Sequence, residues 1–168
     1  MPTNLERMIR LADEVFDTKH DPGQITVTEG TLERLRAIHP ATVTGEETDA
    51  GPIAWMLVIP TTHEIMELFL DRLITEREIL DRTPEGGSYD SVYLCSALVL
   101  PEYREKGVAR RLVLNAIRSI LHEHPIRALF FWPFSEGGDK LARSVATELR
   151  LPLYRRRQGE AGIENSST

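Results

Sequence analysis

The sequence predicts a single mixed α/β (α+β) domain that covers residues 1–168. A chain of 168 residues has the usual length of one domain, and its 41% hydrophobic residues can supply a core without disulfide or metal support. Apolar residues recur at helical spacing in some segments and form strand-like runs in others, in alternation along the chain. No internal repeat or low-complexity segment indicates a second unit.

Two helices are expected in the N-terminal region, residues 1–40. The first, over residues 4–17, has its apolar residues on one face and is therefore amphipathic. The second and shorter helix, over residues 30–38, has Thr28 and Thr31 available as caps.

Residues 41–157 are expected to form the sheet and the core of the domain. From Val92 on, neither alternate set of residues in the strand at 89–100 is strongly polar, which predicts a central strand covered on both faces. A small, polar and flexible tail is expected over residues 158–168. The expected elements are strands 41–46 and 52–60 as a hairpin, a helical connector 63–82, strand 89–100, a helix of about 17 residues from Val108, strand 126–132, helix 136–149 and a short strand 151–157.

The charge of the chain is acidic overall but uneven along the sequence. With 26 acidic and 20 basic residues the formal charge is −6, which disfavours nucleic acid as a partner. Residues 101–118 nevertheless carry five basic and two acidic residues, and residues 150–157 carry four arginines and no acid. Such confined basic segments favour the binding of a small anion, although the second segment is equally consistent with a solvated surface.

Several features bear on compartment and on metal binding. Cys95 is the single cysteine, so an intramolecular disulfide is excluded and a reducing, cytoplasmic location is expected. No stretch approaches the ~18 apolar residues of a membrane span, so no membrane association is expected. His63-Glu64 begins like a zinc-binding helix, but Glu67 stands where the second histidine is needed, and no metal site is expected.

The stretch after the central strand is the most informative for function. Apolar residues 92–100 lead into a short turn and then into a helix whose first turn contains Gly107 and Ala109. Free N–H groups and the positive dipole end of a helix attract anions, and small residues let phosphate oxygens approach the backbone. Arg104, Lys106, Arg110 and Arg111 add positive charge nearby, so a phosphate-binding turn is favoured over an ordinary helix start.

The six residues Arg104-Glu105-Lys106-Gly107-Val108-Ala109 resemble the pyrophosphate-binding signature of the GCN5-related N-acetyltransferase (GNAT) superfamily, and Pro101-Glu102-Tyr103 resembles its usual lead-in. The resemblance extends over residues 41–157 in the order of elements and over 92–118 in motif. It implies a mixed, mostly antiparallel central sheet flanked by helices, in which the connector 63–82 is a helical insertion between the third and fourth strands.

The resemblance also implies the function and the site. Acetyl-CoA would be the cosubstrate, lying where the strand at 92–100 separates from the strand at 126–132, and the acetyl group would pass to a primary amine of a small molecule or peptide. Main-chain groups of three strand residues would pair with the pantetheine, and amides of the turn would hold the pyrophosphate. The implied cofactor-binding residues are Ala97, Leu98, Val99, Arg104, Glu105, Lys106, Gly107, Val108, Ala109 and Arg110.

The chain departs from the family where proton transfer is expected. Ala146 stands in place of the usual tyrosine acid, Asp139 in place of an asparagine, and Trp132 where some members have a glutamate base. The catalytic residues are therefore not identified, and the candidates by position are Ser135, Tyr154, Tyr89, Asp90 or water. A CoA-binding sensor or partner-binding protein of the same fold, without activity, stays open. Because the chain is short after its final strand, a homodimer that completes the sheet edge also stays open.

Overall fold

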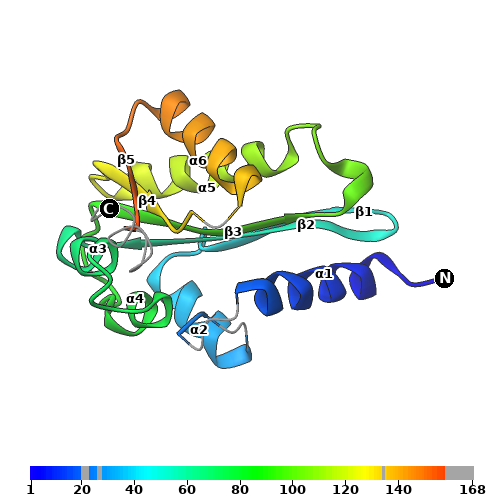
Figure 1. The fold of residues 1–168 in the computed structure, drawn as a ribbon, viewed down its shortest axis with the longest axis horizontal. Helices are drawn as coiled ribbons and strands as arrows, with labels where there is room; N and C mark the ends of the chain where they lie inside the picture. The colour runs from blue at the N-terminus through cyan, green and yellow to red at the C-terminus, as the bar shows by residue number, and fades with distance from the viewer. Residues whose placement is uncertain (20–22, 26–27, 134, 158–168) are drawn as a thin grey trace, which may run out of the picture.

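The computed structural model describes residues 1–19, 23–25, 28–133 and 135–157, and the expected tail at 158–168 lies outside these ranges. Its elements are α1 (Asn4–Lys19), α2 (Glu29–Ile38), β1 (Val43–Thr48), β2 (Gly51–Thr61), α3 (His63–Leu70), α4 (Glu76–Arg82), β3 (Ser91–Val99), the 3₁₀ helix η1 (Pro101–Tyr103), α5 (Val108–Glu123), β4 (Ala128–Phe131), α6 (Glu136–Leu149) and β5 (Leu153–Arg155). The strands form one sheet, with α1 to α4 on one face and α5 and α6 on the other (Figure 1).

The sheet combines antiparallel and parallel pairing. Its strand order is β1-β2-β3-β4-β5; β2 is antiparallel to both of its neighbours, whereas β4 is parallel to both of its own. The antiparallel pairs are the long ones, because β2 has 11 residues and β4 only four. The sheet is thus mixed and mostly antiparallel, and α5 and α6 form the crossovers that parallel neighbours require.

All five strands differ by one or two residues at their ends from the sequence expectation, and the differences in β1, β4 and β5 have a local cause. β1 starts at Val43 because the amide and hydroxyl of Thr42 both bond to the carbonyl of His39 and form a turn. β4 occupies only four residues of the expected 126–132, and Pro133 cannot extend its ladder. β5 is confined to three residues after Pro152.

The helices begin where local side chains can cap them. In α2, α3, α4 and α6 a Ser or Thr hydroxyl accepts from an amide of the first turn, and these caps are Thr28, Thr62, Thr75 and Ser135. The expected connector 63–82 forms two helices, separated by a turn in which Arg72 has φ 63°. These helices lie between β2 and β3, so the insertion precedes the third strand of this sheet and not the fourth, as was expected. Within the described ranges, no helix is both long and apolar enough to cross a membrane.

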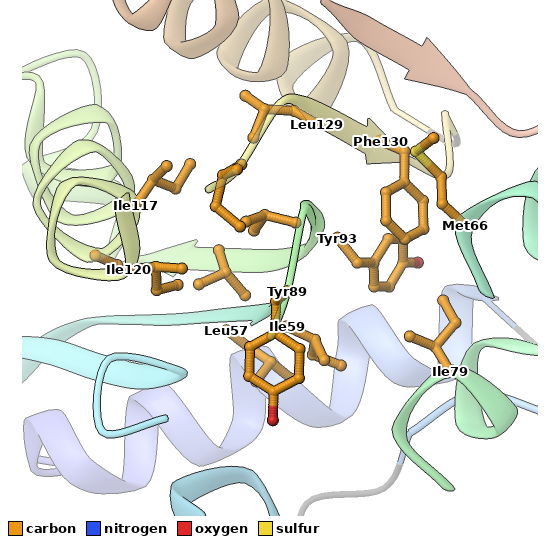
Figure 2. Packing of buried hydrophobic residues seen from close by; sticks show 14 of the residues in the cluster. Leu57, Ile59, Met66, Ile79, Tyr89, Tyr93, Ile117, Ile120, Leu129 and Phe130 are labelled. Carbon is orange, nitrogen blue, oxygen red and sulfur yellow. The ribbon is translucent and has the colours of Figure 1, made fainter. Parts of the chain in front are cut away.

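The main core lies between the sheet and the helices on both of its faces. Tyr93 of β3 is at its centre, with its ring centroid 5.1 Å from that of Phe130 and 5.0 Å from that of Phe69 (Figure 2). All three side chains are fully buried, and burial of an aromatic side chain is among the largest single contributions to stability. The paired part of β3 is therefore held rigidly.

Helix α1 supports the turn that follows β3. Met8 is fully buried in a second cluster together with Val99, Leu100 and Val108. Arg7 donates to both carboxylate oxygens of Glu102 in η1, each at 2.6 Å. This hydrogen bond from Arg7 lowers the pKa of Glu102 to about 2. The N-terminal helix is thus tied to the start of the turn.

Candidate cofactor-binding site

The central strand loses one of its two neighbours halfway along. β3 pairs with β4 only from Ser91 to Leu94, whereas its pairing with β2 continues to Val99. We call residues 95–99 of β3 the open segment, because on the side of β4 they have no strand partner among the described residues. Side chains from Leu94 to Leu98 are only half-buried, although they lie in the central strand. Apart from the Val99 carbonyl, which accepts from Arg104, main-chain groups on this side can bind a ligand.

An irregularity in β3 accompanies this separation. Opposite Leu57 and Val58 of β2 stand Ser96 and Leu94, so Cys95 is an extra residue in the ladder. A β-bulge of this kind bends and twists its strand. On the other side β4 ends at Phe131, and Pro133 follows it closely. The two strands thus diverge from the bulge onward, as the family resemblance implies.

The turn after the open segment presents main-chain amides in a curved arrangement. Glu105 has φ 63° and Gly107 has φ 77°, so left-handed residues alternate with others just before α5. Alternation of this kind forms a concave nest of N–H groups suited to anions. No side chain among the described residues caps the first turn of α5, so the amides of residues 108–110 have no partner from a helix cap.

Gly107 combines two properties at the centre of this nest. Its left-handed φ disfavours any residue with a side chain, and a Cβ built there would meet no described atom within 4 Å. The space in front of the residue is therefore open, and a ligand oxygen can approach the backbone. Both properties fit the role that the sequence analysis assigns to this glycine.

The basic side chains around the turn mostly bind the protein itself. Arg104 donates from Nε to the carbonyl of Val99 at 2.9 Å and holds the turn against the end of β3. Arg110 bonds to Ser144 and Glu148 of α6, and Arg111 to Glu46 of β1. These arginines position the loop, and the anion-attracting groups at the turn are chiefly the amides.

The ten residues that the resemblance implies for cofactor binding follow one another along the chain through the open segment and the turn, and the side chains of Val99 and Val108 among them are buried in the second cluster. Ala97, Leu98 and Val99 belong to the open segment, and η1 carries the chain directly into the nest. The remaining seven lie in the nest and the first turn of α5, namely Arg104, Glu105, Lys106, Gly107, Val108, Ala109 and Arg110.

The candidate proton donors do not gather around the open segment. Tyr89 is buried and its hydroxyl donates to the carbonyl of Pro84, which gives it a structural role. Asp90 and Tyr154 line a cavity of about 190 Å³ at the opposite end of the β3–β4 pairing. Asp90 precedes the bulge at Cys95 by five residues, or ~16 Å along an extended strand. Ser135 caps α6.

Helix α6 offers no hydroxyl where the family has its tyrosine. Ala146 at this position is 6% exposed and packs in the main core. Asp139, at the position of the family's asparagine, pairs with Arg143 at 2.8 Å and with Arg155 at 3.7 Å. Any proton donor for a leaving thiolate must therefore come from another element or from water.

One polar cluster beside the open segment escaped the sequence analysis. Glu76, the first residue of α4, is fully buried, and its Oε1 accepts from the Tyr93 hydroxyl at 3.2 Å and from Cys95 Sγ at 2.8 Å. Burial and then the charge of Glu76 raise the pKa of Tyr93 well above its usual value, so that Tyr93 stays protonated and donates. The only sequence signal for this cluster is Glu76 itself, a charged residue in a segment with helical spacing of apolar residues.

No family model and no curated protein matches the chain. Among solved structures, the crystal structure of an aminoglycoside acetyltransferase, meta-AAC0020 from an uncultured soil metagenomic sample in complex with sisomicin, is similar with a TM-score of 0.48 and 12% identity over 82% of this chain and 76% of that one. With its central strand separating from a parallel neighbour and leading through a turn into a long helix, this chain has a GNAT-like fold.

Proposed function

We propose that the chain is an acyl-CoA-dependent N-acyltransferase that moves an acetyl group from acetyl-CoA to a primary amine of a small molecule or peptide. The observation that carries the proposal is the continuity of the open segment with the nest at residues 105–107. A strand edge can bind an amide-containing chain, and a nest at a helix start can bind phosphate. Pantetheine followed by pyrophosphate has this order of groups.

Each part of the site then has a chemical task. Main-chain groups of Ala97 to Val99 would pair with the pantetheine amides in the manner of an added strand. Amides of residues 105–110 would hold the pyrophosphate, with Gly107 allowing close contact. In the reaction the thioester carbonyl oxygen gains negative charge, and a main-chain N–H of the open segment can stabilise it.

The acceptor is an amine on both chemical and electrostatic grounds. Attack on a thioester needs a nucleophile with a free electron pair, and a primary amine that has lost its proton supplies one. Before reaction such an amine is cationic, and the formal charge of −6 attracts cations.

Two measurements test the proposal. Calorimetric titration should show binding of acetyl-CoA and much weaker binding of acetyl-pantetheine, which lacks the phosphates that the nest would hold. Release of free CoA thiol should then be followed with a panel of primary amines, after subtraction of hydrolysis without amine. Absence of acetyl-CoA binding at millimolar concentration contradicts the proposal.

A CoA-binding protein without catalysis is the second candidate. It is favoured by the buried Ala146, since α6 supplies no acid at this position. Binding of acetyl-CoA with no amine-dependent thiol release across the panel would select this candidate over the enzyme.

A further inference from the structure

The buried Glu76 lies at the point where three strands stop pairing. Leu94, Phe131 and Arg155 are the last residues paired across β3, β4 and β5. The residues that follow them are Cys95, Trp132 and Arg156. The Arg156 guanidinium lies over the rings of Trp132 and Phe69, at 5.1 and 4.2 Å from their centroids, and donates to main-chain carbonyls of residues 69 and 74. Cys95 thus occupies the first position of the open segment.

The three hydrogen-bonded groups differ in their access to solvent. Glu76 and Tyr93 are fully buried, whereas Cys95 is half-buried. Of the three residues, Cys95 is therefore the one that a bound molecule can contact. The carboxylate behind it is held in place by a second donor, the Tyr93 hydroxyl, on the same oxygen atom.

This arrangement has the features of an activated nucleophile. A nucleophile needs a base within hydrogen-bond reach, and the base needs a third group that orients it. Cys95 Sγ lies 2.8 Å from Glu76 Oε1, and Tyr93 holds that oxygen from the other side at 3.2 Å. The positive charge of Arg156 is close enough to lower the pKa of Tyr93, against larger opposing effects of burial and of Glu76.

We propose, resting on the proposed function, that Cys95 accepts the acyl group from the thioester of acyl-CoA before the amine does. The Cys95 proton passes to Glu76 as Sγ bonds to the acyl carbon, the bond from that carbon to the CoA sulfur breaks, and the CoA thiolate leaves with the proton that Glu76 releases. The amine then attacks the Cys95 thioester, the C–N bond forms, the C–Sγ bond breaks, and a proton from the amine restores the thiol. No oxidant or reductant is needed.

The experiment tests whether the acetyl group passes from acetyl-CoA to the protein itself in the absence of any amine. The full chain is mixed with acetyl-CoA, quenched in acid and weighed by mass spectrometry, and peptide mapping locates the added acetyl group. In parallel, isotopically labelled free CoA is added, and the slow direct thiol exchange measured without protein is subtracted. Label that enters acetyl-CoA above this background, without amine, indicates an acyl-enzyme. We expect label exchange, and an acetyl group on Cys95 wherever hydrolysis is slower than the quench. Both should be absent in Cys95→Ala.

Glu76→Gln tests the role of the carboxylate. It keeps the shape of the side chain but removes the base, and exchange should fall roughly 10²-fold or more. Glu78→Gln is the matched control, since Glu78 lies on the same helix, is exposed, and as glutamine can still close the capping box with Thr75. This control should exchange like the parent chain. Melting curves and acetyl-CoA titration verify that each variant folds and binds.

The outcomes separate this inference from the proposed function. Acetyl-CoA binding and amine-dependent thiol release, with neither exchange nor adduct, would mean direct transfer and overturn the role of Cys95 alone. Undiminished exchange in Cys95→Ala has the same meaning. Loss of exchange in folded, ligand-binding Cys95→Ala supports the inference. Failure of the parent chain to bind acetyl-CoA overturns the inference and the proposed function together.

Discussion

Gly107 and Gly86 both have a left-handed φ but lie in different turns, so paired substitutions at the two sites test the proposed phosphate-binding turn. Their φ angles are 77° and 71°, and a Cβ at either would meet no described atom within 4 Å. An alanine at either position therefore costs only the strain of the left-handed backbone, about 1–2 kcal/mol. In a domain of this size that cost lowers the melting temperature by about 2–8 °C.

The ligand effect should differ sharply between the two positions. At a concentration of acetyl-CoA a hundredfold above its dissociation constant, the parent chain gains about 2.7 kcal/mol, or about 5–11 °C. Gly107→Glu places a carboxylate against the pyrophosphate, and juxtaposed like charges cost several kcal/mol. A hundredfold weaker affinity already reduces the gain at the same concentration to about 0.4 kcal/mol. Gly86→Glu adds the same charge in a turn outside the candidate site.

The assay is thermal melting of the parent chain and of the alanine and glutamate variants at both positions, with and without acetyl-CoA. Without ligand, each pair of variants should melt at similar temperatures. With ligand, the shift should disappear in Gly107→Glu and stay complete in Gly86→Glu. A complete shift in Gly107→Glu would refute the placement of phosphate at this turn. Equal losses at both positions would attribute the effect to added charge in general.

Two further predictions concern the supports of the site. Because Arg7 lowers the pKa of Glu102 to about 2, the stabilisation from this pair is complete above the unfolded value near 4.5 and is lost as the pH falls toward 2. In Glu102→Gln, the melting temperature should therefore depend less on pH between these two values. An unchanged slope of melting temperature against pH would contradict the assignment. Thr75→Ala removes the N-cap of α4 and should cost about 1 kcal/mol, whereas Thr75→Ser should restore most of it in denaturant titrations.

Helices and strands whose ends are set by residues adjacent in the sequence were well predicted. The helix expected at 136–149 has those bounds because Ser135 supplies its own cap, accepting from the amide of Gly138. The strand expected at 89–100 forms over Ser91–Val99, and Pro101 begins the turn that ends it. The nest around Gly107 also lay within reach of sequence analysis, because its backbone geometry requires a residue type that can be read directly.

The exposure of the central strand could not be predicted from its own residues. Leu94 to Leu98 are largely apolar and indicate coverage on both faces, yet they are half-buried because β4 ends after four residues. Burial of one strand thus depends on the length of another. For this reason the separation of the strands came from the family resemblance, and the pattern of residues alone indicated the opposite.

The partners of charged residues, and the burial of an acidic one, could not be predicted from the sequence either. Arg110 and Arg111 lie beside the turn in sequence, but their partners Glu148 and Glu46 are 38 and 65 residues away, so the local charge sum overstated the field at the nest. Glu76 looks like a surface residue of a short helix. It is buried because two donors, Tyr93 and Cys95, reach it from a strand 17 and 19 residues later.

The proposed recognition of a ligand by main-chain atoms of the open segment has a consequence for how such a site varies between proteins. Every residue type supplies the same amide and carbonyl, so positions 97–99 can change identity while the ligand keeps its partners. Gly107 has less freedom, since its left-handed backbone disfavours residues with a side chain and a ligand would lie close to it. The open segment, which would contact the ligand over several residues, would then show little sequence conservation among related proteins. Most of the conservation at the site would fall on the single glycine at position 107.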